Sequence, residues 1–358
     1  EIKSLPNLTE FGAWRGRGEV IEPQYGGGPD RYGGFYSHED IREVVKYAAD
    51  RAIHIVPEID VPGHCYAAIR ALPLILGNTV RKPTGGPRSV QGFEANVLNP
   101  ASQATYAFLE AVLSEVLELF PAQRGVHIGM DEIPHGAWSD DAKEEEELKA
   151  FLAQWLQNFL VQRGTRLLGW EEAFYAANGL LSEVRPRSVA FAWKEDERFA
   201  VHAASAGFDV VLCPAHFLYL DHVQTVDFEE RGLYWATTEL PLERIYAYEP
   251  IDRLRSMGLP LGTEERLLGL AANLWSETVV EPSLAEELLF PRLLAVAEVA
   301  WTAASRRDWT DFHWRIAAQL SWRMRDDNLK DYGGRACGLL TLGSFMRVPR
   351  VPPKKGSG

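Results

Sequence analysis

Apolar positions along the chain alternate between helical and strand spacing, and this alternation predicts repeated helix and strand units. Four apolar side chains share one helical face over 38–48, behind Ser37 and Asp40, a pair typical of a capping box. Further helical patterns lie near 101–119, 145–163, 196–206, 284–301 and 308–326. Short apolar runs typical of buried strands lie at 53–56, 125–129, 166–170, 188–193, 209–213 and 268–275. Strands alternating with helices at this spacing predict a parallel sheet.

Each predicted strand ends in polar or aromatic residues, which is typical of a barrel whose active site lies at the strand ends. We therefore expect an α/β fold of the TIM-type (β/α)8 kind, incomplete or N-terminally shortened, because only six strands are evident where a closed barrel needs eight. The expected organisation is a Gly-rich N-terminal segment over 1–37, the barrel over 38–330 and a C-terminal tail over 331–358.

An open barrel would expose strand edges, which is costly for a monomer in water. Three explanations stay open: a fragment of a longer or processed enzyme, a homodimer whose partner covers the gap, and a shortened barrel filled by its own N-terminal segment. The homodimer is the first expectation.

Composition excludes several classes of partner. The chain carries a formal charge of −13 with no basic stripe, so neither nucleic acid nor an anionic membrane is an expected partner. No apolar run reaches the length of a membrane span. The three cysteines, Cys65, Cys213 and Cys337, are far apart and predict free thiols. The compartment stays open between a cytoplasmic protein and an exported one whose leader has been removed.

The run Val126–Glu132 is the strongest candidate for chemistry, because it ends in two adjacent carboxylates, Asp131 and Glu132. Adjacent acids repel one another unless one is protonated or both serve a ligand. A protonated Glu beside an ionised Asp is the pairing that cleavage of a glycosidic bond requires. The alternative is two solvated acids at the start of a loop.

Other strand ends supply matching residue types. Asp60 lies four residues before His64 across a Pro-Gly turn and can hold that imidazole in one tautomer, although a simple turn pair is the alternative. Three tryptophans end three strands and predict the walls of a sugar pocket, with core packing as the alternative. They are Trp170, Trp193 and Trp275. The histidines and acids show no metal-ligand spacing, so no metal is expected.

Six segments resemble glycoside hydrolase family 20, the β-N-acetylhexosaminidases, in the family's order and over roughly residues 1 to 325. They are Leu8–Gly16, Pro57–His64, His127–Glu132, Gly169–Glu172, Tyr219–Asp221 and Asn273–Glu277. The resemblance implies exo-acting, retaining removal of terminal β-linked GlcNAc or GalNAc, in which the substrate's own acetamido oxygen attacks the anomeric carbon and forms an oxazolinium ion. Transfer of the sugar to other acceptors is a further expectation. No cofactor is implied.

The resemblance also implies residue roles. Glu132 would be the acid and then the base, Asp131 would orient the acetamido group, and Tyr219 would donate a hydrogen bond to the acetamido oxygen. The three tryptophans would enclose the sugar and its N-acetyl group. The outer hydroxyls would be bound by Asp221 and Glu277, while a layer behind Glu132 would tune its proton affinity through Asp60, His64 and His127.

Two departures from the family pattern qualify this assignment. Met130 stands where a Gly is usual and adds a bulky side chain beside the acids. The two strand units that normally come first, one with an Arg that binds sugar hydroxyls, are not recognisable. A catalytically silent sugar-binding protein is therefore the main alternative to an enzyme, and a metal-dependent hydrolase is a third.

Overall fold

The computed structural model describes residues 1–16, 30–77, 96–120, 125–176, 179–181, 184, 187–227 and 230–323. It divides into two compact units, the first being Glu1–Ala215 with Pro250–Ala271, and the second His216–Glu249 with Ala272–Gly358. Within the second unit, the expected tail over 331–358 lies outside the described residues, as does Cys337.

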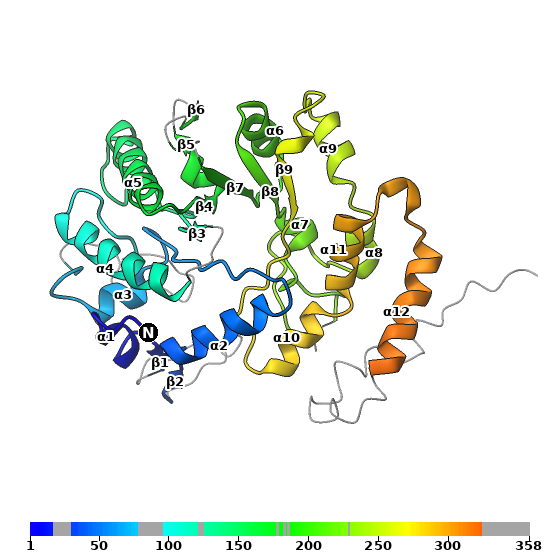
Figure 1. Cartoon of the computed structure of the whole chain (residues 1–358), viewed down its shortest axis with the longest axis horizontal. Coiled ribbons are helices and arrows are strands. Elements are labelled where there is room, and N and C mark those ends of the chain that lie inside the picture. Colours follow the sequence, from blue (N-terminus) through cyan, green and yellow to red (C-terminus); the bar gives the residue numbers. More distant parts are fainter. Residues whose placement is uncertain are drawn as a thin grey trace, which may run out of the picture. The chain divides into compact units, whose positions relative to one another are not determined.

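A parallel sheet organises the first unit, with its strands in the order β3-β4-β7-β8-β9 (Figure 1). Every neighbouring pair in this sheet is parallel. The strands are β3 (Val126–His127), β4 (Leu167–Trp170), β7 (Ser188–Ala192), β8 (Asp209–Leu212) and β9 (Leu267–Leu270). Sequential parallel strands joined by helices confirm the expected α/β fold class of the TIM-barrel type.

The segment 57–61 adds a sixth parallel partner beside β3. Its backbone pairs through His127 N to Pro57 O at 2.9 Å and Ile59 N to His127 O at 2.8 Å. The prediction of a buried strand over 53–56 is therefore wrong, since the pairing lies in the residues that follow. Ile53 is 56% exposed and Val56 39%, which shows that an apolar run becomes a buried strand only where a neighbouring backbone and a covering layer meet it.

Helices cover the sheet where the sequence places them. The capping box between Ser37 and Asp40 is present at α2 (His38–Ala49), although Val44 on its expected apolar face is exposed. The helices α4 (Gln103–Leu119) and α5 (Ala142–Gln162) bury leucines in one continuous core with β3 and β4. The helix α6 (Arg198–Ser205) packs on β7 and β8. These helices hold the strand ends in place.

Shorter elements complete the first unit. The hairpin-like pairs are β1 (Trp14–Arg15) with β2 (Tyr32–Gly33) and β5 (Tyr175–Ala176) with β6 (Gly179–Leu180). The short helices are α1 (Asn7–Glu10), α3 (Tyr66–Ala71), α9 (Pro250–Ser256) and the 3-10 turns η2 (Glu171–Phe174) and η4 (Glu264–Arg266).

The second unit is mainly helical. Its helices are α8 (Leu242–Tyr246), α10 (Pro282–Leu289), α11 (Arg292–Trp301) and α12 (Trp309–Arg323), with η5 (Ala304–Arg306). The helix α7 (Ala215–Leu218) begins at the last residue of the first unit's main segment. The single helix predicted over 284–301 is wrong, because Pro291 lacks an N–H and separates α10 from α11.

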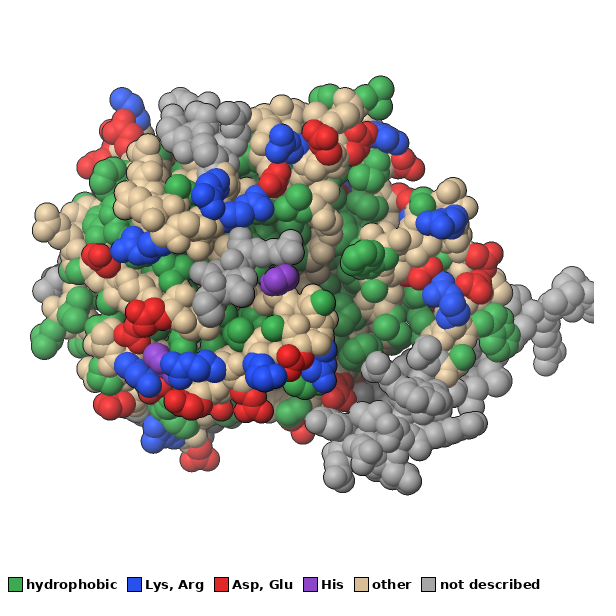
Figure 2. All heavy atoms as spheres, in the orientation of Figure 1, with side chains coloured by type: hydrophobic (Ala, Val, Ile, Leu, Met, Phe, Trp, Pro, Cys, Tyr) green, Lys and Arg blue, Asp and Glu red, His purple; other side chains and the backbone are tan. Residues whose placement is uncertain are grey.

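The described surface mixes charges of both signs. Lys and Arg side chains alternate with Asp and Glu over the face seen in Figure 2, with hydrophobic side chains between them. Among the described helices, none is long and apolar enough to cross a membrane.

Candidate active site

A turn of left-handed backbone carries the two adjacent acids away from β3. Gly129 has φ +65°, and a Cβ there would lie 1.7 Å from Asp60 Oδ1, so only glycine fits. Met130 and Glu132 also have positive φ, at 74° and 48°. Such conformations cost on the order of 1–2 kcal/mol for residues with side chains and persist where the surroundings impose them.

Met130 does not project among the acids. Its side chain is fully buried in the apolar core, and its N–H donates to Asp60 Oδ1 at 3.3 Å. The side chain that Met130 adds in place of glycine therefore lies in the apolar core beneath the turn.

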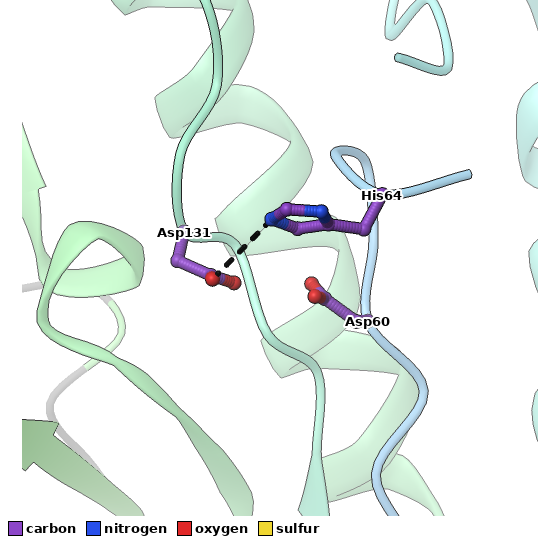
Figure 3. Close-up of side chains that lie close together, drawn as sticks. All are labelled: Asp60, His64 and Asp131. Atoms are coloured by element: carbon purple, nitrogen blue, oxygen red, sulfur yellow. Dashed lines mark ion pairs between the residues drawn. The ribbon is translucent and has the colours of Figure 1, made fainter. Parts of the chain in front are cut away.

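His64 lies between the two acids. Its Nε2 is 3.6 Å from Asp131 Oδ2 and 3.4 Å from Glu132 Oε2 (Figure 3 shows the Asp131 side). Burial lowers the pKa of His64, but hydrogen bonding to the two carboxylates outweighs burial and raises the pKa to about 10. The imidazole is therefore a cation at neutral pH and forms ion pairs with both acids.

Asp60 comes from the same segment as His64, and its carboxyl group also faces Asp131 (Figure 3). Burial, reinforced by the charge of Asp131, raises the pKa of Asp60 to about 9. Asp60 therefore keeps its proton at neutral pH and donates it in its hydrogen bond with Asp131. The Asp131 carboxylate thus lies beside a neutral acid and a cationic imidazole.

Exposure separates the roles of the two adjacent acids. The side chain of Asp131 is 13% exposed, whereas that of Glu132 is 41% exposed. The held carboxylate is Asp131, and Glu132 is the one that a molecule from solution can reach.

The same residues offer donors for a cation. One ligand atom each from Asp60, His64 and Asp131 lies within 4.8 Å of the others. At neutral pH two of these groups carry protons, which a metal ion would have to displace. The expectation of no metal stays a prediction.

A second cluster joins the ends of segment 57–61, β3 and β4. Glu58 Oε1 accepts from Trp170 Nε1 at 3.0 Å and lies 3.1 Å from His127 Nδ1. The imidazole packs edge-on against Trp170, with ring centroids 4.7 Å apart. Trp170 is only 4% exposed, so it is largely core at this point. His127 contacts Glu58, Trp170 and Phe191, and its expected effect on Glu132 stays a prediction.

A third cluster follows β4 and β7. Trp193 Nε1 donates to Glu172 Oε2 at 3.0 Å, and Lys194 Nζ lies 2.9 Å from Glu172 Oε1. The ammonium group is also 3.4 Å from Glu171 Oε1. Burial raises the pKa of Glu171 to about 7 despite this cation. The sequence showed both glutamates at the strand end, but nothing in the pattern marked Lys194 as their partner.

In the second unit, Tyr219 and Asp221 lie beside the segment that carries Trp275. Tyr219 pairs with Asn273 in a parallel bridge, and its ring centroid is 6.1 Å from that of Trp275. Asp221 is fully buried and accepts from Trp275 N at 3.3 Å. Burial raises the pKa of Asp221 to about 7, and the charge of Glu277 adds to this rise. Tyr219 and Asp221 thus each contact Trp275, and Glu277 is near enough to Asp221 for its charge to act on that carboxyl group.

Arg292 holds this arrangement and was not recognised from the sequence. It is fully buried, and its five N–H groups make five hydrogen bonds to main-chain carbonyls. Two of the acceptors, Leu220 O and His222 O, flank Asp221. A charged residue on a helix gives no sequence signal that it will be buried.

Comparisons with known proteins identify the family of the chain. The family model "Glycosyl hydrolase family 20, catalytic domain" matches residues 1–304. A β-hexosaminidase of Vibrio furnissii is 42% identical over 308 residues, which are 83% of this chain and 48% of that protein. A β-N-acetylhexosaminidase of Cellulomonas fimi is 34% identical over 88% of this chain and 57% of its own length.

A solved structure shows the same fold. The exo-β-N-acetylglucosaminidase of Vibrio harveyi in complex with N-acetylglucosamine superposes with a TM-score of 0.78 and 43% identity, over 90% of this chain and 50% of that one. The chain spans about half the length of these relatives. On the family match over most of its length, the chain belongs to glycosyl hydrolase family 20.

Proposed function

We propose that this chain acts as an exo-acting, retaining β-N-acetylhexosaminidase on carbohydrate ends that carry a terminal β-linked N-acetylhexosamine. The observation that carries the proposal is the donor–acceptor series Asp60–Asp131–His64–Glu132, which presents one reachable carboxyl group beside one held carboxylate. Substrate-assisted cleavage needs both groups, a reachable acid that transfers the proton and a fixed carboxylate that stabilises the acetamido group. Transfer of the sugar to an acceptor other than water is part of the proposal.

The first step breaks the glycosidic bond. Glu132 donates its proton to the leaving oxygen while the substrate's acetamido carbonyl oxygen attacks C1 from the opposite face. The C1–O bond breaks, its electron pair stays with the leaving alcohol, and an oxazolinium ring forms. Asp131 accepts the acetamido N–H and stabilises the positive charge that grows on this nitrogen.

The second step reverses the proton transfer. The Glu132 carboxylate takes a proton from a water molecule as that water attacks C1, which opens the oxazolinium ring and restores the acetamide. The configuration at C1 is retained because two inversions have occurred. His64 is not consumed in either step.

The roles of the remaining predicted residues rest on the resemblance. Trp170 and Trp193 in the first unit would line the sugar pocket. In the second unit, Tyr219 would bind the acetamido oxygen, Trp275 would line the pocket, and Asp221 with Glu277 would bind hydroxyls. These assignments stay predictions.

Glu132→Gln and Asp131→Asn test the proposal. Glu132→Gln should lower kcat by 10²–10⁴-fold on an alkyl aglycone and far less on a dinitrophenyl aglycone, which needs no protonation. Asp131→Asn should slow acetamido substrates and leave product binding nearly intact. The exposed Glu39→Gln on α2 is the matched control. Equal losses for both aglycones would contradict the role of Glu132.

We also infer that a second copy of the chain associates with the exposed apolar residues before segment 57–61. Support comes from Tyr47, Ile53 and Val56, which are 61%, 56% and 39% exposed. Exposed apolar side chains are typical of surfaces that associate with another chain.

A further inference from the structure

The strongest unassigned feature is the ion-pair cluster that follows β4 and β7. In the parallel register Trp170 lies opposite Phe191, so the residues after these two strands leave the sheet side by side. Glu171 and Glu172 follow β4, in η2, while Trp193 and Lys194 follow β7. The cluster therefore joins two neighbouring strand ends.

The contacts form a closed circuit around the indole of Trp193. The indole N–H donates to one oxygen of Glu172, and Lys194 Nζ binds the other oxygen at 2.9 Å. Glu171 fixes the lysine twice, through Nζ at 3.4 Å and through its backbone N–H at 3.5 Å. The backbone of Trp193 is held as well, because its carbonyl accepts from Ala215 N at 2.8 Å.

This circuit fixes the orientation of a ring rather than merely its position. An indole has one polar atom, Nε1, so a hydrogen bond there determines the rotation of the ring about its own stem. Glu172 can act as a rigid acceptor only because Lys194 holds its second oxygen. The side chains of Glu171 and Glu172 are 8% and 17% exposed, so water competes weakly for these contacts.

We propose that Glu172 and Lys194 are positioning residues that set the ring plane of Trp193 and thereby the length of N-acyl group the enzyme accepts. The proposal rests on the proposed function, in which Trp193 encloses the N-acetyl group. A ring whose orientation is fixed by a charge-assisted hydrogen bond cannot turn aside, so the pocket has no space for one extra methylene of the acyl group. A ring released from Glu172 turns and admits longer acyl groups.

The experiment compares p-nitrophenyl β-glucosaminides that carry N-acetyl, N-propionyl and N-butyryl groups. The native chain should lose roughly 10–200-fold in kcat/KM for each added methylene. Glu172→Ala should weaken this discrimination by about tenfold through KM, with a smaller change in kcat for the N-acetyl substrate. Glu172→Gln, which keeps an acceptor for the indole, should restore most of it. The neighbouring exposed Glu195→Ala is the control.

A second readout follows the ring without requiring turnover. The ¹⁵N–¹H resonance of the Trp193 indole, assigned with Trp193→Phe, should move upfield in Glu172→Ala and in Lys194→Met but not in Glu195→Ala. In an active chain, unchanged acyl discrimination in Glu172→Ala would overturn the proposal, whether or not the resonance moves.

The two readouts separate this proposal from the proposed function. If the native chain hydrolyses none of the glycosides, the proposed function fails and the positioning role is decided by the resonance alone. A shifted resonance then supports the clamp, and an unshifted one overturns it. If the native chain is active and Glu172→Ala discriminates as before, only the positioning role fails.

Discussion

Asp60→Asn tests whether a proton resides on Asp60 in the folded protein. Asparagine has the same shape as a protonated aspartate and donates from a neutral group, so the hydrogen bond to Asp131 is preserved. The replacement removes only the ability to ionise. We expect the variant to fold and to be more stable than the native chain at neutral pH.

The size of the effect follows from the raised pKa of Asp60, about 9 against an ordinary value of 3.8. Between these values the folded state binds the proton and the unfolded state has lost it, so stability is complete below pH 3.8 and is lost as the pH rises toward 9. From pH 4 to pH 7 the free energy of unfolding should fall by up to about 4 kcal/mol in the native chain through this one group. Water that enters the site when Asp60 ionises reduces this loss of stability. We therefore expect the unfolding free energies of the native chain and of Asp60→Asn to differ by about 2–4 kcal/mol at pH 7.

The assay is urea unfolding at several pH values between 4 and 8, followed by near-ultraviolet circular dichroism. Ionisable groups that do not interact with Asp60 contribute equally to both proteins, so the difference between the two curves reports on Asp60 together with its neighbours Asp131 and His64. The exposed Asp50→Asn is the control and should follow the native curve. If the stability of Asp60→Asn fell with pH as steeply as that of the native chain, Asp60 would be ionised and the donor–acceptor series would be wrong.

Three further predictions concern the scaffold. Arg292→Met should lose about 4 kcal/mol of unfolding free energy, because five hydrogen bonds worth roughly 1 kcal/mol each disappear; an unchanged urea midpoint would refute its role. Gly129→Ala should abolish measurable turnover, whereas Gly164→Ala, which has a similar positive φ but open space, should only lower stability by about 1 kcal/mol. Light scattering after size-exclusion chromatography should give twice the mass of the 40.1 kDa chain, and Val56→Lys should shift it to the monomer.

The sequence located the two central acids because strand periodicity and the resemblance point to the same place. The end of a short buried strand is visible in the pattern of residues, and parallel strands bring such ends to one edge. Asp131, Glu132 and His64 meet there as expected. The resemblance implied that His64 would lie near Glu132, whereas spacing alone left a simple turn pair with Asp60 as the alternative.

The protonation of Asp60 could not be predicted, because it depends on burial and on a backbone approach that only the fold creates. Gly129 allows the turn to close onto the Asp60 carboxyl group, and the charge of Asp131 then disfavours a second charge beside it. The same limit applies to Arg292, whose four carbonyl acceptors come from separate segments of the second unit. The errors at 53–56 and at Pro291 have a simpler origin, since an apolar pattern continues past the point where pairing or a helix ends.

The measurement that tests the central claim most directly is release of p-nitrophenol from the β-GlcNAc and β-glucose glycosides, with and without a GlcNAc-thiazoline. The thiazoline resembles the oxazolinium ion, so it competes with the substrate for a site that is shaped to stabilise this ion. We predict turnover of the acetamido glycoside alone, blocked by the thiazoline. Equal hydrolysis of the glucoside, insensitive to the inhibitor, would contradict substrate assistance, and binding of the inhibitor by a folded chain without turnover would identify a silent sugar-binding protein instead.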